Sequence, residues 1–171
     1  YAVVNPNRQD ELGDLSHLCA AAVVFLCLVE MRRLLRQSAG ESPDLLDMLD
    51  LVALATVADV APLVGVNRAF VRQGLKILSS RKRIGLAALS DQIKIEQEIS
   101  AYHLGFLLGP RINAGGRLGK PDLGAQLLIA KDLETAKAIA ERLDQLNFER
   151  RELENQIKEA ALEKAAHHKS F

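Results

Sequence analysis

The sequence predicts a mostly α-helical chain with one or two short strands. Three observations lead to this fold class. Alanine and leucine, which both favour helix, dominate the 171 residues. Apolar residues recur at spacings of three, four and seven through the C-terminal part of the chain, which is typical of an amphipathic helix. One short continuous apolar run, Leu51 to Val57, has the length of a strand that is buried on both faces.

The composition agrees with a packed, non-membrane protein. Hydrophobic residues make up 49% of the chain and the formal net charge is zero, which argues against disorder. The longest apolar run, residues 18–29, is too short to span a bilayer and predicts a buried helix. Its two cysteines, Cys19 and Cys27, would lie about 12 Å apart on that helix, beyond disulfide reach. We therefore expect reduced cysteines, a cytoplasmic location and no membrane partner.

The remaining elements follow from turn and capping residues. The opening YAVVNPN is a second, β-like run that ends at Asn5, Pro6 and Asn7, and it suggests that the sequence begins within a domain. A buried helix is the alternative to the strand at residues 51–57, because alanine is common there. We predict helices over residues 15–37, from the cap Ser42 onward, over 68–79 with Asn67 as the cap, over 85–90, after Ser100, over 122–130, and from the cap Asp132 to about 166.

Asp59 stands at the end of the apolar run and is the first candidate functional residue. An ionised carboxylate in an apolar setting costs about several kcal/mol unless it is paired or bound to a metal. Hard cations such as Mg²⁺ and Mn²⁺ prefer carboxylate oxygens, and functional groups gather at the carboxyl ends of parallel strands. We therefore predict Asp59 as a catalytic metal ligand. The alternative is a loop aspartate in an Asx turn or a helix cap.

The stretch GPRINAGGRLG is the second candidate. Arg111 and Arg117 flank Asn113 and the pair Gly115 and Gly116. Guanidinium groups fork onto phosphate oxygens, and glycines let the backbone approach a ligand closely. The five residues therefore predict a site for a phosphodiester backbone, although the spacing is neither a Walker loop nor a dinucleotide fingerprint. A tight interhelical turn with solvent-exposed arginines is the alternative.

The charges are distributed unevenly along the chain. Residues 1–60 hold 4 basic and 9 acidic residues, residues 61–120 hold 10 and 3, and residues 121–171 hold 8 and 10. A basic middle third suggests an anionic partner, and a basic surface without a ligand is the alternative.

Adjacent residues on a helix point in different directions, so we do not expect the doublet His167 and His168 to bind one metal ion.

Five stretches carry a family resemblance. In order along the chain, VVNPN, LCAAAVVF, DLVALATVADVAPL, NRAFVRQGL and LGPRINAGGRLGKPD resemble the RecJ family of the DHH phosphoesterase superfamily. The likeness covers essentially the whole chain, and TVADVAPL and GPRINAGGRLG are long, specific signatures. The resemblance implies an α/β parent protein with a parallel sheet flanked by helices. It also implies 5′-to-3′ hydrolysis of single-stranded DNA, in DNA repair and recombination, with two Mn²⁺ or Mg²⁺ ions.

The resemblance also assigns roles to positions and partners to the parent protein. Asp59 matches the last metal-binding aspartate of the family, and Arg111, Asn113 and Arg117 match the motif expected along the DNA phosphate path. Residues 1–130 would be the C-terminal part of the DHH catalytic lobe, and residues 131–171 a connecting helix toward a second lobe of the DHHA1 type. Single-stranded DNA is the implied partner, together with a single-stranded-DNA-binding protein and a helicase.

Departures from the family pattern limit what this chain could do alone. The earlier aspartate motifs and the Asp-His-His sequence are absent, and Ala22 stands where the family pattern predicts glycine. One aspartate does not hold two metal ions, so we expect an inactive fragment of an active parent. Two alternatives remain: another DHH-type phosphodiesterase, acting on oligonucleotides or cyclic dinucleotides, and a non-catalytic, RecJ-like DNA-binding scaffold.

Overall fold

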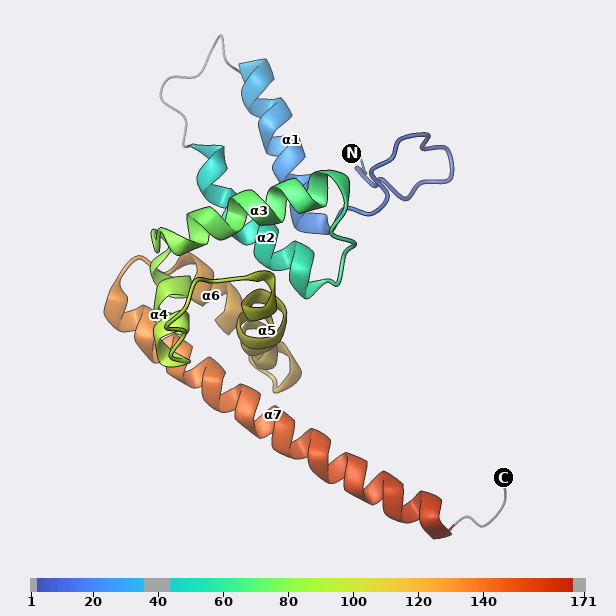
Figure 1. The fold of residues 1–171 in the computed structure, drawn as a ribbon, viewed down its shortest axis with the longest axis vertical. Helices are drawn as coiled ribbons and strands as arrows, with labels where there is room; N and C mark the ends of the chain where they lie inside the picture. The colour runs from blue at the N-terminus through green and yellow to red at the C-terminus, as the bar shows by residue number, and fades with distance from the viewer. Residues whose placement is uncertain (1–2, 36–43, 168–171) are drawn as a thin grey trace. The chain divides into compact units, whose positions relative to one another are not determined.

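The structure, a computed structural model, describes residues 3–35 and 44–167, and every regular element in these ranges is helical (Figure 1). The residues group into two compact units. The first holds the described residues up to Arg83 together with Ile95–Gly109, and the second holds Ile84–Lys94 and the described residues from Pro110 onward. The elements are α1 (Ala20–Leu35), η1 (Leu45–Met48), α2 (Leu49–Ala58), α3 (Gly65–Ser79), α4 (Ile84–Gln92), η2 (His103–Leu108), α5 (Gly109–Arg117), α6 (Leu123–Ile129) and α7 (Leu133–His167).

The first unit is built around α2, which packs against α1, α3 and η2. An edge-to-face pair between Phe25 of α1 and Phe70 of α3, with ring centroids 5.5 Å apart, joins the two outer helices. Gly74 lies in the contact between α3 and α2, where a Cβ atom would overlap the Leu49 carbonyl oxygen and the Ala53 methyl group. The backbones of α2 and α3 can therefore approach closely only because position 74 has no side chain.

The prediction of a strand at residues 51–57 is wrong, and its helical alternative is correct. This run forms most of α2, and Val52, Ala53 and Leu54 are buried within it. A helix surrounded by other elements is apolar on all sides, so its sequence shows no amphipathic period and looks like a buried strand. The described part of the opening run, residues 3–5, also forms no strand, since no second strand pairs with it.

Most predicted helices are confirmed, although α1 begins at Ala20 rather than at residue 15 and one cap changes. Helix α3 begins at Gly65 rather than Arg68, and Asn67 lies inside its first turn instead of capping it. Asp132 does cap α7: the Thr135 N–H donates to Asp132 Oδ1 at 2.8 Å, and this bond lowers the pKa of the Asp132 carboxyl. The predicted cap Ser42 lies outside the described residues. The division of a parent protein at residue 130 stays a prediction.

The second unit packs α4, α6 and the first half of α7 against one another. Gly85 of α4 meets Leu127 of α6, where an added Cβ would overlap the Leu127 carbonyl oxygen. From residue 151 to residue 166 every side chain of α7 is exposed, so this half of the helix has no packing partner among the described residues. The core of the second unit contains Leu86, Leu89, Leu127, Leu143 and Leu146.

Within residues 3–35 and 44–167, no helix combines the length and the apolar character that a membrane span requires.

The contact at Gly74 predicts a large effect of a single methyl group. Gly74→Ala should lower the free energy of unfolding by about 1–3 kcal/mol, because α3 must move away from α2 to admit the side chain. Urea denaturation followed by circular dichroism measures this change. Gly116→Ala is the control, since its new methyl group would meet no heavy atom within 4 Å. Equal stability of the two variants would contradict the close packing of α2 and α3.

Candidate functional site

Asp59 is the residue that closes α2 at its C-terminus. Its N–H donates to the Ala55 carbonyl at 2.8 Å, and the N–H groups of Val60 and Ala61 donate to the carbonyls of Val57 and Thr56 at 3.1 and 3.0 Å. These two bonds form a Schellman motif, which requires a left-handed residue after the helix. Val60 takes that conformation, with a φ of 56°, although a β-branched residue adopts it only under strain. The end of α2 is therefore held by hydrogen bonds, and these bonds fix the backbone position of Asp59.

The Asp59 carboxylate is exposed and makes no hydrogen bond or ion pair with any residue that the structure describes. The Asx turn considered from the sequence is therefore not formed. Asp59 also does not lie at the end of a strand, since it follows a helix. The C-terminus of a helix carries partial negative charge, so a carboxylate there is favoured only when a cation joins it. The geometry thus suits cation binding, and the assignment of Asp59 as a metal ligand stays a prediction.

Asn67 anchors the loop that follows Asp59. Its side chain is fully buried, and Nδ2 donates to the carbonyls of His17 and Pro62, both at 3.0 Å. One amide therefore ties the loop to the segment that precedes α1. The buried Oδ1 of Asn67 and Nε2 of His17 have no hydrogen-bond partner in the described part of the chain. Asn67 is therefore not the helix cap that its sequence position predicts, and no local pattern indicates a partner fifty residues away.

The stretch that leads into the arginine motif packs against the same end of α2. The π-helical turn η2 contacts α2, and a Cβ on Gly105 would come within 3.2 Å of Val57. Gly109, the first residue of the motif, lies beside Ala58, the residue before Asp59. π-Helical turns are rare and occur frequently at functional sites. Within the first unit, the two sequence signatures therefore meet at one place.

The rest of the motif belongs to the second unit, where Arg111 and Arg117 have different surroundings. Arg111 is partly buried, and its Nε donates to Asp144 of α7 at 2.7 Å. Arg117 and Asn113 are exposed in the last two turns of α5. Arg111 therefore has a structural bond that the sequence did not suggest, since its partner lies 33 residues away. Arg117 retains the geometry expected of a phosphate contact, and the binding role of both arginines stays a prediction.

The glycines of the motif also differ. Gly115 is buried, and the Lys120 N–H donates to its carbonyl at 2.8 Å as the chain turns back after α5. A Cβ at Gly115 would overlap the Lys120 carbonyl oxygen, so the turn itself requires glycine. Gly116 is exposed, with open space around it. Close approach of a ligand to the backbone is therefore available at Gly116 and is blocked at Gly115.

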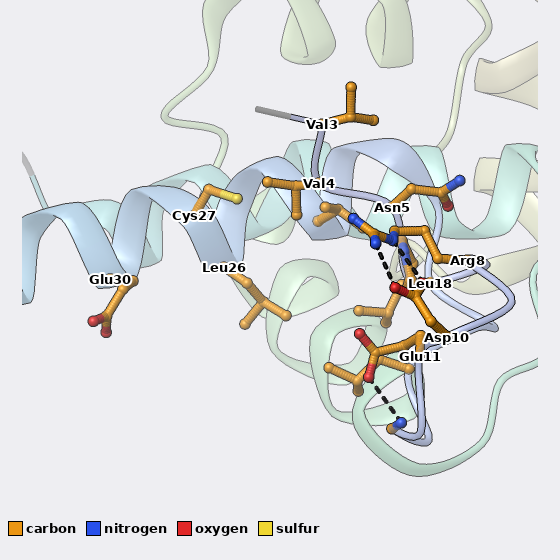
Figure 2. Close-up of a pocket in the computed structure, with 14 residues that line it drawn as sticks. Val3, Val4, Asn5, Arg8, Asp10, Glu11, Leu18, Leu26, Cys27 and Glu30 are labelled. Atoms are coloured by element: carbon orange, nitrogen blue, oxygen red, sulfur yellow. Dashed lines mark hydrogen bonds and ion pairs between the residues drawn. The ribbon is translucent and has the colours of Figure 1, made fainter. Parts of the chain in front are cut away.

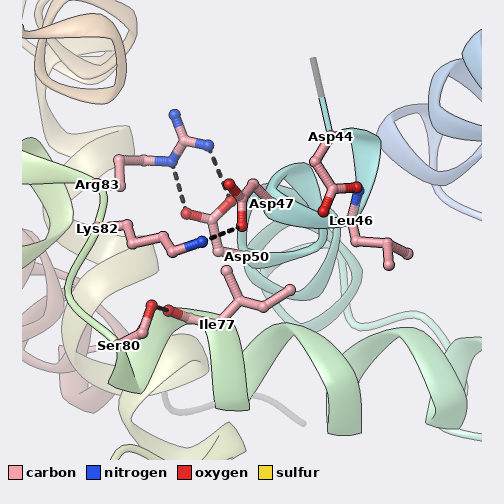
Figure 3. Close-up of polar contacts among 8 residues, drawn as sticks. All are labelled: Asp44, Leu46, Asp47, Asp50, Ile77, Ser80, Lys82 and Arg83. Atoms are coloured by element: carbon pink, nitrogen blue, oxygen red, sulfur yellow. Dashed lines mark hydrogen bonds and ion pairs between the residues drawn. The ribbon is translucent and has the colours of Figure 1, made fainter. Parts of the chain in front are cut away.

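A buried carboxylate, Asp50, lies at the start of α2, and nothing in the local sequence indicates its burial. Asp50 is 2% exposed and accepts two bonds from Arg83, at 2.6 Å from Nε and 3.0 Å from the terminal nitrogen (Figure 3). Beside it, Lys82 donates to Asp47 at 2.8 Å, which raises the pKa of Lys82 (Figure 3). These pairs join η1 and the start of α2 to the chain after α3. They neutralise two carboxylates that could otherwise be taken for ligands.

A hollow of about 610 Å³ lies between the N-terminal segment and α1 (Figure 2). Its polar groups are occupied locally: Arg8 forms two bonds with Asp10, and Glu11 accepts from the Gly13 N–H. Its remaining lining is largely apolar, with Val3, Val4, Leu18 and Leu26. We assign it no ligand, because each of its charged side chains already has a partner: Arg8 with Asp10, Glu11 with the Gly13 N–H, and Glu30 with Arg33.

The residues present do not form a metal site by themselves. Across residues 3–35 and 44–166 no three His, Cys, Asp or Glu side chains converge to hold an ion. Asp59 would therefore contribute one ligand to a site whose other ligands lie outside the described chain. Two metal ions need more ligands than one carboxylate supplies.

No family model matches the chain. Over nearly its whole length, however, the chain is similar to a segment of exonucleases that are specific for single-stranded DNA. These relatives are RecJ proteins, and the resemblance inferred from the motifs is confirmed. The Salmonella typhimurium protein, "Single-stranded-DNA-specific exonuclease RecJ", is 38% identical over 169 residues, which are 94% of this chain and 29% of that protein. The chain thus spans less than a third of the relative's length.

Solved RecJ structures agree with the helical fold. RecJ from Thermus thermophilus in complex with Mn²⁺ matches with a TM-score of 0.75 at 35% identity, over 84% of this chain and 21% of that one. Another structure, exonuclease RecJ bound to manganese, matches with a TM-score of 0.81 at 34% identity, over 94% of this chain and 40% of that one. The Thermus protein is also known in complex with Mg²⁺. Both metals are those expected from the sequence.

The two bonds of Asn67 predict how this position responds to substitution. Asn67→Ala should lower the free energy of unfolding by about 1–3 kcal/mol, because two carbonyl oxygens lose their donor. Asn67→Asp should cost more, since a carboxylate would face those same two oxygens without a proton to share. Thermal melts of both variants at neutral pH measure the difference. If Asn67→Asp proved as stable as Asn67→Ala, the loop would not be held through this amide.

Proposed function

We propose that the chain is part of a metal-dependent exonuclease that degrades single-stranded DNA from the 5′ end, by two-metal hydrolysis of phosphodiester bonds, in DNA repair and recombination. The observation that carries this proposal is the similarity to RecJ exonucleases through 94% of the chain. Asp59, whose exposed carboxylate has no partner among the described residues, supports it from the structure. The 171 residues alone should be inactive, since they offer one ligand for two ions.

Within this proposal Asp59 contributes an oxygen ligand to a Mn²⁺ or Mg²⁺ ion. Its exposure leaves the carboxylate accessible, and the Schellman turn after it fixes its backbone. The ion would offset the negative charge that α2 gathers at this end. Asn67 acts as a positioning residue, because it holds the loop that follows Asp59 by donating to the Pro62 carbonyl.

The arginine motif acts on the substrate rather than on the metal. Arg117 and Asn113 present exposed polar groups, and Gly116 leaves the backbone open beside them. Such groups suit phosphate oxygens, which carry no sequence information, so the chain would hold DNA without regard to base sequence. A single-stranded-DNA-binding protein and a helicase are proposed partners on the basis of the family resemblance alone, and a cytoplasmic location agrees with the two free cysteines.

Replacement of Asp59 tests the metal assignment. In the full-length protein that carries this chain, Asp59→Asn should reduce degradation of single-stranded DNA by more than about a hundredfold, because the amide removes a charged ligand but keeps its shape. The rate should be measured over a series of Mn²⁺ concentrations, beside a thermal melt. Asp10→Asn is the control, since Asp10 is also exposed but already paired with Arg8. Near-normal turnover of Asp59→Asn at low Mn²⁺ would reduce Asp59 to a helix-end residue.

The two arginines of the motif should separate by their surroundings. Arg117→Ala should flatten the log–log salt dependence of single-stranded DNA binding by about 0.7, the slope of one phosphate contact, and leave the melting temperature unchanged. Arg111→Ala should lower the melting temperature, because Asp144 loses its ion-pair partner. Binding titrations at several salt concentrations and thermal melts give both quantities. An unchanged slope for Arg117→Ala would leave Arg117 as a solvent-exposed residue at the end of α5 without a phosphate contact.

A further inference from the structure

The segment between Asp59 and Asp91 contains no acidic residue and six basic ones. The structure divides these six into two groups. Lys82 and Arg83 pair with Asp47 and Asp50, and Arg81 also has an interaction partner. The other three are exposed and form no ion pair with any described residue: Arg68, Arg72 and Lys76.

These three cations form a row along the outer face of α3. They stand four residues apart, so their Cα atoms are spaced by about 6 Å along the helix. Rows at this spacing make ridges on a helix surface. The neighbouring row consists of Gly65, Ala69 and Gln73, whose small first two members leave a hollow beside the cations. The six residues line a groove of about 610 Å³.

The opposite face of α3 explains why the row cannot turn inward. Val71, Gly74 and Leu78 are buried, and Gly74 contacts the backbone of α2. The helix is therefore fixed in rotation, and its cationic row stays toward solvent. Three like charges on one face repel one another and no acidic residue lines the groove, so a polyanion would gain from binding there.

We propose that Arg68, Arg72 and Lys76 form a track for the phosphodiester backbone of single-stranded DNA. This inference rests on the proposed function and deepens it, because it assigns to α3 a DNA contact separate from the arginine motif. Regularly spaced cations suit a regularly spaced chain of phosphates. The groove has no aromatic residue on which a base could stack, so binding is independent of base sequence.

The experiment compares two triple variants of the full-length protein. The test variant is Arg68→Gln, Arg72→Gln and Lys76→Gln. The control variant is Lys137→Gln, Arg151→Gln and Lys158→Gln. It also removes three positive charges, but from exposed positions of α7. Binding of a fluorescent oligo(dT) is titrated at several salt concentrations in EDTA, which prevents metal-dependent cleavage. The test variant should flatten the log–log salt dependence by about 2, which is about 0.7 for each lost phosphate contact, and the control should leave it unchanged.

The outcomes separate this inference from the proposed function. An unchanged slope in the test variant, while the unmodified protein binds and degrades single-stranded DNA, would overturn the track and leave the proposed function standing. Displacement of oligo(dT) by poly-L-glutamate as effective as by unlabelled oligo(dT) would overturn the assignment to nucleic acid. A protein that neither binds nor degrades single-stranded DNA would overturn both. Circular dichroism of the test variant should match the unmodified protein, because all three side chains lie outside the core.

Discussion

The first unit depends on the close contact between α2 and α3 at Gly74. Because this position has no side chain, α3 lies directly on the backbone of α2 near Leu49 and Ala53. That contact determines which face of α3 is buried, and so which face is left for Arg68, Arg72 and Lys76. Helix α3 also covers one face of α2, whose buried residues extend from Leu49 to Thr56, three residues before Asp59. One glycine thereby determines which face of α3 carries the exposed cations.

The sequence predicted the helices better than it predicted their environment. Long periodic stretches such as α7 and capped starts such as Asp132 carry local signals, and these were read correctly. Helix α2 was taken for a strand because burial on all sides removes the period that distinguishes the two. Asn67 was taken for a cap because its partner His17 lies fifty residues away. Tertiary contacts of this kind leave no mark in the local pattern.

The candidate site shows the same limit. The sequence singled out Asp59 because a carboxylate follows an apolar run, and the structure leaves that carboxylate exposed with no partner among the described residues. Nine residues earlier, Asp50 looks equally ordinary in the sequence but is buried and held by Arg83. Only the structure separates the carboxylate that already has a cation from the one that lacks it. The likeness to RecJ then gives the second one a role that its geometry permits.

The same distinction applies to the basic residues, and it carries the functional argument furthest. An arginine that already donates to a carboxylate has fewer N–H groups left for a phosphate, and the negative charge beside it weakens its attraction to DNA. Arg111 and Arg83 are of this kind, and Lys82 is likewise paired with Asp47. The exposed cations of α3, and Arg117 at the end of α5, form no ion pair with any described residue, so a phosphate adds a partner without displacing one. We therefore expect the cations without an ion-pair partner among the described residues to contribute most to DNA binding. A place in the arginine motif does not by itself identify these cations.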